Sequence, residues 1–226
     1  MWSYYGSKGK IVKHYPKPKH SLIIEPFAGT AKYSLLHNSH NVLLNEKYET
    51  VYKIWKWLIE DATEEEILSN IDFFLGDNIE CLNIKQEHKD LIGFIINRGS
   101  ASPANIVGKW SCQVKSNPNW ASTPNYSLKQ ISKNLKNIKH WKVNYGDYKN
   151  IPNIEATWFI DPPYKNGGQY YSINDIDYEE LSKWCKSRKG QVIVCENSDA
   201  DWLNFKPLLE INGQRKKTIE VIWTNE

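Results

Sequence analysis

The segment TWFIDPPY, residues 157–164, joins a short apolar run to a proline-rich polar turn. Its first four residues are typical of a buried β-strand, and the two prolines prevent the strand from continuing. Comparable apolar runs occur at 21–25, 41–44 and 191–195. Apolar residues at helical spacing occur at 31–36, 49–60, 127–138 and 178–185. This alternation predicts the α/β class, with a mostly parallel sheet covered on both faces.

Two further elements are indicated by turn and capping signals. Residues 63–66, Thr-Glu-Glu-Glu, have the pattern of a capping box that opens a helix. Residues 208–211 and 218–223 flank Asn212-Gly213 and predict an antiparallel hairpin at the end of the chain.

The turn after residues 157–160 carries groups that suit a planar amine. Asp161 places a carboxylate at the end of a buried strand, and the carbonyl oxygen of Pro162 is left free because Pro163 cannot donate a hydrogen bond. The ring of Tyr164 follows at once. A nucleobase with an exocyclic amine could stack on this ring and give its two amino hydrogens to the two acceptors. The alternative is a plain turn with a capping aspartate.

Two other strand ends carry candidate ligand-binding residues, since ligands of open α/β sheets lie beyond the carboxyl ends of the strands. The segment after the first strand consists of Phe27, Ala28, Gly29, Thr30 and Ala31. The small residues that follow Phe27 allow a tight turn close to a ligand. Glu46 ends the second strand, where an acidic side chain can bind ribose hydroxyls. Each signal alone is equally compatible with an ordinary turn or a surface carboxylate.

The charge distribution points to a polyanionic partner. The net charge is only +3, from 29 Lys and Arg against 26 Asp and Glu, but residues 91–146 contain eight basic and no acidic residues. Aromatic residues are interleaved with these cations. The sequence therefore predicts a nucleic-acid surface, against the alternative of a solvated basic face. Its candidate residues are Arg98, Lys109, Trp110, Lys115, Trp120 and Tyr126, with Lys216 in the hairpin turn as a further phosphate contact.

Several classes of protein are disfavoured by composition. A hydrophobic fraction of 40% supports a core, and no apolar run has the length of a membrane span. The first residues lack the apolar centre of a signal peptide, so the expected location is cytoplasmic. The four cysteines form no CxxC pair, and no metal site is predicted.

These motifs together resemble the Dam-like, α-class N6-adenine-specific DNA methyltransferases, over nearly the whole chain and in the family's order. The similar segments are residues 4–8, 25–31, 45–48, 94–98, 144–148, 161–164, 196–198 and 220–225. The Asp-Pro-Pro-Tyr motif is intact. The chain departs from the family pattern with Ala31 for a second glycine, Glu46 for aspartate and Tyr4 for tryptophan, and its recognition region is only weakly similar.

The resemblance implies a Rossmann-like, S-adenosylmethionine-dependent methyltransferase fold and methylation of adenine in a short double-stranded DNA sequence by base flipping. The implied catalytic residues are Asp161, Pro162, Pro163 and Tyr164. The implied cofactor residues are Tyr4, Lys8, Phe27, Ala28, Gly29, Thr30, Ala31, Glu46, Asp147, Tyr148 and Asp161.

The expected organisation is a catalytic domain of residues 1–60 and 140–226, with a target-recognition insert at 61–139. Two alternatives stay open: an adenine methyltransferase that acts on RNA, and a catalytically silent DNA-binding module on the same fold. The recognised site, the choice between monomer and homodimer, and membership of a restriction–modification system or a phage also stay open.

Overall fold

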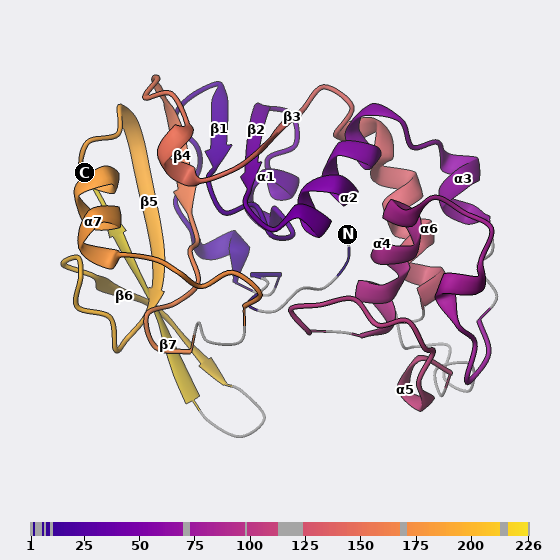
Figure 1. The fold of residues 1–226 in the computed structure, drawn as a ribbon. Coiled ribbons are helices and arrows are strands. Elements are labelled where there is room, and N and C mark those ends of the chain that lie inside the picture. Colours follow the sequence, from indigo (N-terminus) through magenta and orange to yellow (C-terminus); the bar gives the residue numbers. More distant parts are fainter. Residues whose placement is uncertain are drawn as a thin grey trace. The chain divides into compact units, whose positions relative to one another are not determined.

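The computed structural model describes residues 2, 6, 8, 9, 11–69, 73–97, 99–112, 124–167, 171–212 and 217–225 (Figure 1). The chain forms two compact units. The helical unit comprises residues 1–7 and 49–140, and the sheet unit comprises residues 8–48 and 141–226. The segment 49–60, expected in the catalytic domain, groups with the helical unit. The role of residues 61–139 as a target-recognition insert stays a prediction.

The described strands form one seven-stranded sheet in the order β3-β2-β1-β4-β5-β7-β6. They are β1 (Leu22–Glu25), β2 (Asn41–Glu46), β3 (Lys142–Tyr145), β4 (Ala156–Ile160), β5 (Gly190–Asn197), β6 (Lys206–Asn212) and β7 (Lys217–Thr224). The pairs from β3 through β5 are parallel, and β7 is antiparallel to both β5 and β6. The predicted Rossmann-like α/β class with a C-terminal antiparallel hairpin is confirmed.

The strand order determines where a ligand can bind. From β1 the chain passes outward to β2 and β3 and then returns to β4, which pairs with β1 on its other side. The order therefore reverses between β1 and β4, and the crevice beyond the carboxyl ends of these two strands is the expected ligand site of such a sheet. The segments that begin at Pro26 and Asp161 both leave the sheet there.

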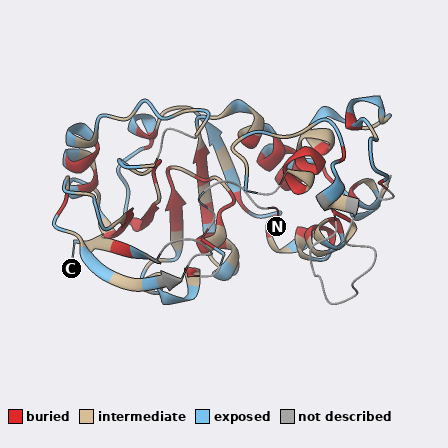
Figure 2. Cartoon of the chain, turned by 90° about the horizontal axis from the view of Figure 1, so that it is seen from below, coloured by how far each residue is buried: buried red, intermediate tan, exposed pale blue. Residues whose placement is uncertain are grey.

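The core of the sheet unit explains the apolar strands. All five residues of β4 are buried, as are the six central residues of β5 (Figure 2). Helix α7 (Tyr178–Lys186) packs on this core through Trp184, whose ring meets that of Trp158 edge-on at 5.5 Å between centroids. The sheet unit also contains α1 (Lys32–Leu36) and the short 3₁₀ helices η1 (Val12–His14) and η5 (Tyr148–Asn150).

The described part of the helical unit contains no strand of the sheet. Its helices are α2 (Glu49–Glu60), α3 (Glu64–Leu68), η2 (Ile79–Cys81), α4 (Gln86–Ile96), α5 (Lys109–Cys112), α6 (Pro124–Asn134) and η4 (Leu135–Asn137). The capping box is confirmed, since the Thr63 side chain accepts from the Glu66 amide and the Glu66 side chain accepts from the Thr63 amide, each at 3.1 Å. Gly93 lets the following loop lie against α4, because a Cβ there would lie 2.6 Å from Pro103.

One predicted helix needs correction, and one strand and two α-helices of the structure were not predicted. The expected helix at 127–138 begins at Pro124, which the first helical turn tolerates, and continues after Asn134 as 3₁₀ helix. Strand β3 and helices α4 and α5 were not predicted. The side chains of β3 are mostly exposed, so it lacks an apolar signal, and α4 ends in an apolar run that does not show helical spacing.

Two absences hold for the residues that the structure describes. No helix among them is long and apolar enough to cross a membrane. No group of three or more metal-ligating side chains occurs in the same ranges. Cys185 and Cys195 are buried free thiols, whereas Cys81 is exposed.

Candidate active site at the carboxyl edge of the sheet

Asp161 lies directly beyond β4 and is paired with a buried lysine. The Lys8 ammonium lies 3.1 Å from Oδ1 of Asp161 and 3.4 Å from Oε1 of Glu220 on β7. The side chain of Asp161 is 20% exposed, whereas that of Lys8 is 7% exposed. One cation thus joins two carboxylates at the end of the central strand, and one of these carboxylates keeps access to a ligand.

Glu220 also fixes the aromatic ring of the motif. Its Oε1 accepts hydrogen bonds from the hydroxyl groups of Tyr164 at 2.7 Å and Tyr15 at 2.6 Å, and the Lys8 ammonium contacts the Tyr164 hydroxyl. The half-buried ring of Tyr164 is therefore held at its polar end. Sequence reasoning missed the roles of Tyr15 and Glu220. The single acidic residue within the otherwise uncharged run 218–223 is the one signal that could have indicated Glu220.

The two prolines place their carbonyl groups differently. The carbonyl oxygen of Pro163 accepts a hydrogen bond from the Tyr178 hydroxyl at 2.6 Å. The carbonyl oxygen of Pro162 accepts none from the described residues. The acceptor that the sequence singled out is therefore unpartnered among the described residues, in a buried residue beside a carboxylate and an aromatic ring.

Burial and the neighbouring charges set the ionisation of this cluster. Burial raises the pKa of Asp161 to about 6, with Lys8 opposing this shift and Glu220 adding to it. Burial lowers the pKa of Lys8, but Asp161 and Glu220 more than offset this effect, so the pKa of Lys8 lies above its ordinary value. At neutral pH the cluster therefore holds a charged lysine and an Asp161 that is mostly ionised.

The loops after β1 and β2 are joined by Glu46. Its Oε2 accepts from the Gly29 amide and its Oε1 from the Tyr48 amide, both at 2.9 Å. Burial raises the pKa of Glu46 in spite of these hydrogen bonds. Two ionised carboxylate oxygens offer about four acceptor positions, so the described contacts leave room for hydroxyl groups of a ligand.

The segment between β1 and α1 turns sharply. Gly29 and Ala31 both have φ of +45°, and Ala31 is the one described non-glycine residue with positive φ. Ala28, Thr30 and Ala31 are buried, whereas Phe27 and Gly29 are half-buried. Position 31 is alanine where the similar family has a second glycine, so a residue with a Cβ atom adopts the left-handed backbone conformation there.

We expect Ala31→Gly to raise the free energy of unfolding by about 1 kcal/mol, because an L-residue pays roughly that cost in the left-handed region and glycine does not. Urea unfolding with an unchanged m-value would measure the gain. Ala28→Gly is the matched control and should lower stability, since the backbone at Ala28 does not have positive φ. Lower stability of Ala31→Gly would contradict the strain at this turn.

The loop after β3 completes this edge of the sheet. The Asn45 side-chain amide donates to the carbonyl oxygens of Pro26 at 3.2 Å and Gly146 at 2.9 Å. Asp147 accepts from the Lys149 amide at 3.1 Å and from the Lys47 ammonium at 3.0 Å. The Phe27 and Tyr148 rings lie 5.3 Å apart. Loops after three neighbouring strands are thus held together by side chains.

Two further buried carboxylates support the site. Glu25, the last residue of β1, accepts from the Ser34 amide at 2.8 Å, and burial raises its pKa to about 8. Glu196 on β5 accepts from the Lys165 amide at 2.8 Å and from the Trp202 indole at 3.0 Å, which anchors the chain just after Tyr164. The sequence analysis gave neither residue a role.

The structure does not bring all predicted site residues together. Tyr4, Arg98, Lys115, Trp120 and Lys216 lie outside the described residues, as does the side chain of Trp110. Lys109 and Tyr126 are exposed in the helical unit. The predicted cofactor and catalytic residues other than Tyr4 all belong to the sheet unit.

Comparisons with known proteins give only remote structural likeness. No family model matches the chain, and no curated protein matches it. An rRNA methyltransferase, AviRa, from Streptomyces viridochromogenes is 12% identical, with a TM-score of 0.38 over 91% of this chain and 79% of that one. A putative methylase from Haemophilus influenzae is 11% identical, with a TM-score of 0.36 over 91% and 80%. A putative methyltransferase from Escherichia coli is 10% identical, with a TM-score of 0.35 over 97% and 80%. Likeness this remote carries no argument about the reaction.

Proposed function

We propose that this chain transfers a methyl group from S-adenosylmethionine to the exocyclic amino group of adenine in DNA. The observation that carries the proposal is the arrangement at the end of β4, where a partly exposed carboxylate, a carbonyl without a hydrogen-bond partner among the described residues and an anchored aromatic ring follow one another. The sequence resemblance to the Dam-like methyltransferases supports the same reaction.

The target amine matches the two acceptors. An exocyclic amino group has two hydrogens, and the carboxylate of Asp161 and the carbonyl oxygen of Pro162 each accept one. Accepting both hydrogens draws the nitrogen lone pair out of conjugation with the base, so that it can attack an electrophile. A target adenine reaches these acceptors only after it leaves the stack of the double helix. Tyr164 then supplies the face on which the base stacks.

The loops beyond β1, β2 and β3 fit S-adenosylmethionine. Glu46 offers acceptors for the ribose hydroxyls, Asp147 an acceptor for the adenine amine, and Phe27 with Tyr148 an apolar surface for the adenine ring. The positive φ of Gly29 allows a close approach of the backbone. S-adenosylmethionine supplies an electrophilic methyl group on a sulfonium, and the protein residues align the amine with it.

We expect turnover to fall as the pH drops through about 6, because Asp161 accepts amine hydrogens only in its ionised form. Lys8 lowers the pKa of Asp161, so Lys8→Met should move this acid limb to higher pH. Single-turnover rates measured as a function of pH would show the shift.

Lys8→Arg is the matched control for this prediction, since it keeps the positive charge beside Asp161 and should leave the limb near its original pH. An acid limb that stays in place in Lys8→Met would show that the protonation of Asp161 does not limit the reaction.

The helical unit is proposed to contact phosphates. Lys109 is exposed, and we expect Lys109→Ala to lower the slope of log affinity against log salt concentration by about one unit. Fluorescence anisotropy at several salt concentrations would measure the slope. Lys186→Ala, an exposed change on α7, is the control and should leave the slope unchanged. An equal slope for Lys109→Ala and the unmodified protein would remove Lys109 from the interface.

The proposed function is tested by mapping methylated adenines in unmethylated plasmid DNA after incubation with the protein and S-adenosylmethionine. Methylation at one recurring short sequence would support the proposal and identify the site. Methylation of a parallel RNA substrate alone would assign the same chemistry to RNA. Labelling of neither nucleic acid, with S-adenosylmethionine bound, would overturn the proposed substrate.

A further inference from the structure

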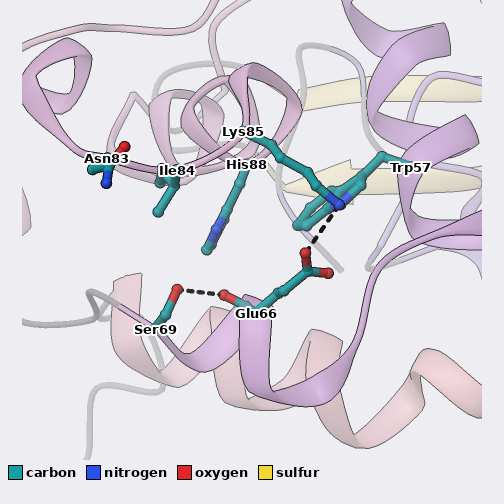
Figure 3. Close-up of a pocket in the computed structure, with 7 residues that line it drawn as sticks. All are labelled: Trp57, Glu66, Ser69, Asn83, Ile84, Lys85 and His88. Atoms are coloured by element: carbon teal, nitrogen blue, oxygen red, sulfur yellow. Dashed lines mark hydrogen bonds and ion pairs between the residues drawn. The ribbon is translucent and has the colours of Figure 1, made fainter.

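A separate pocket of about 400 Å³ lies within the helical unit (Figure 3). Its wall comes from three helices and the segments beside them: Trp57 on α2, Glu66 on α3, Ser69 after α3, Ile84 and Lys85 before α4, and His88 on α4. This volume is in the range of sites that hold small molecules. None of these residues belongs to the sheet unit, so the pocket is independent of the proposed transfer site.

His88 carries a buried ring nitrogen without a hydrogen-bond partner at the wall of this pocket. The residue is 2% exposed, its ring extends from α4 into the pocket, and its Nε2 atom has no hydrogen-bond partner (Figure 3). Burial lowers the pKa of His88 to about 4, so the ring is neutral at pH 7. A neutral imidazole has one N–H donor and one lone pair, so the unpartnered Nε2 accepts a hydrogen bond when the proton is on Nδ1.

Aromatic surface adjoins this acceptor. The rings of Trp57 and His88 are stacked, with centroids 5.2 Å apart and an interplanar angle of 26°. The indole N–H of Trp57 is also buried without a hydrogen-bond partner. Buried polar atoms of native proteins nearly always have a partner, so a ligand in the pocket is one source of partners for these two atoms. Flat rings are the groups that pack best against a stacked aromatic pair.

The charged residues at the pocket neutralise each other. Glu66 forms an ion pair with Lys85 at 2.9 Å and is held by the capping box with Thr63. The Ser69 hydroxyl donates to the backbone carbonyl of Glu66 at 2.7 Å. The charges of the residues that line the pocket therefore cancel. A neutral ligand is favoured there over a phosphorylated one.

We propose that this pocket binds a neutral, planar nitrogen heterocycle that donates a hydrogen bond to Nε2 of His88. A free nucleobase or a nucleoside has this chemistry, since its ring stacks and its edge carries N–H donors. The free nucleobase and the nucleoside differ only in the sugar. A nucleoside monophosphate should bind more weakly, because the one cation among the described lining residues, Lys85, is already paired with Glu66.

The test follows the imidazole nitrogens of the full-length protein by two-bond proton–nitrogen NMR, with the probes adenine, adenosine and adenosine monophosphate. The His88 signals are assigned by their loss in His88→Phe. We expect adenine or adenosine to shift the Nε2 resonance of His88 at millimolar concentration, and the monophosphate to bind about tenfold more weakly or worse. Adenine binding without adenosine binding would identify the free base as the ligand, and equal binding would include the nucleoside.

Two variants connect binding to the pocket. His88→Phe keeps a flat ring and removes the acceptor. In ligand-detected NMR it should weaken adenine binding about tenfold or more, measured in the Asp161→Ala background with saturating S-adenosylmethionine so that the sheet unit does not contribute. Ile84 lines the pocket, so the larger side chain of Ile84→Trp should fill part of the pocket and block binding without changing His88. His14→Phe, an exposed change in the sheet unit, is the control and should leave binding unchanged.

Three results would overturn the proposal. The first is the absence of any shift at His88 with all three probes in the folded protein. The second is full affinity in both His88→Phe and Ile84→Trp. The third is stronger binding of a methylguanidinium probe than of adenine, which would assign the pocket to a cationic group such as an arginine side chain of a partner protein.

Discussion

Asp161→Ala is expected to reduce methyl transfer about 1,000-fold or more while changing the affinity for S-adenosylmethionine less than about tenfold. The substitution removes one of the two acceptors that orient the amine, and it removes the negative charge that stabilises a developing positive charge on the nitrogen. The residues proposed to hold the ribose and adenine of the cofactor, Glu46 and Asp147, are bound by other groups and stay in place.

The variant should fold, because the buried Lys8 keeps Glu220 as a partner at 3.4 Å. Isothermal titration calorimetry with S-adenosylmethionine and a single-turnover methylation assay would separate binding from turnover. Asp201→Ala is the matched control: Asp201 is an exposed carboxylate that pairs with Lys165, and its loss should leave turnover intact. Turnover that survives in Asp161→Ala would remove Asp161 from the reaction.

The elements of the fold that could be predicted are those that are buried and show their pattern within a few neighbouring residues. Strand β4 and the motif after it show both the apolar run and the turn chemistry within eight residues. Strand β3 could not be found in this way, because it pairs with β2 at the edge of the sheet and its side chains stay mostly exposed. The apolar half of α4 is a continuous run rather than a stripe, so its periodicity does not distinguish a helix from a strand.

The site residues that directly follow a strand could be predicted from the sequence. In a parallel sheet the carboxyl ends of neighbouring strands share one edge, so Glu46 and Asp161 were expected at the same edge. Contacts between segments far apart in the sequence could not be predicted. The hydrogen bond from Tyr164 to Glu220 joins residues 56 positions apart, and no local pattern encodes it. The buried Lys8 likewise gains its partners only once β4 and β7 are in place.

Tyr164→Ala is expected to lower kcat/KM about 10- to 100-fold, because one aromatic platform contributes ~1–3 kcal/mol to the binding of an unstacked base. Tyr164→Phe keeps the ring and loses the hydroxyl group that donates to Glu220. The Glu220 carboxylate still accepts from Tyr15 and still pairs with Lys8, so this change leaves no buried acceptor without a partner. Its effect should therefore stay within about tenfold.

The comparison of these two variants separates stacking from a structural role of the hydroxyl group. DNA that carries 2-aminopurine at the mapped target position reports unstacking of the base by its fluorescence. With Tyr164→Ala we expect the fluorescence gain to reach half its maximum at a higher protein concentration, whereas Tyr164→Phe should keep the original midpoint. If both variants lost turnover equally and both kept the original midpoint, the hydroxyl group and its bond to Glu220 would be the functional element. Tyr164 would then position Lys8 and Asp161 rather than hold the base.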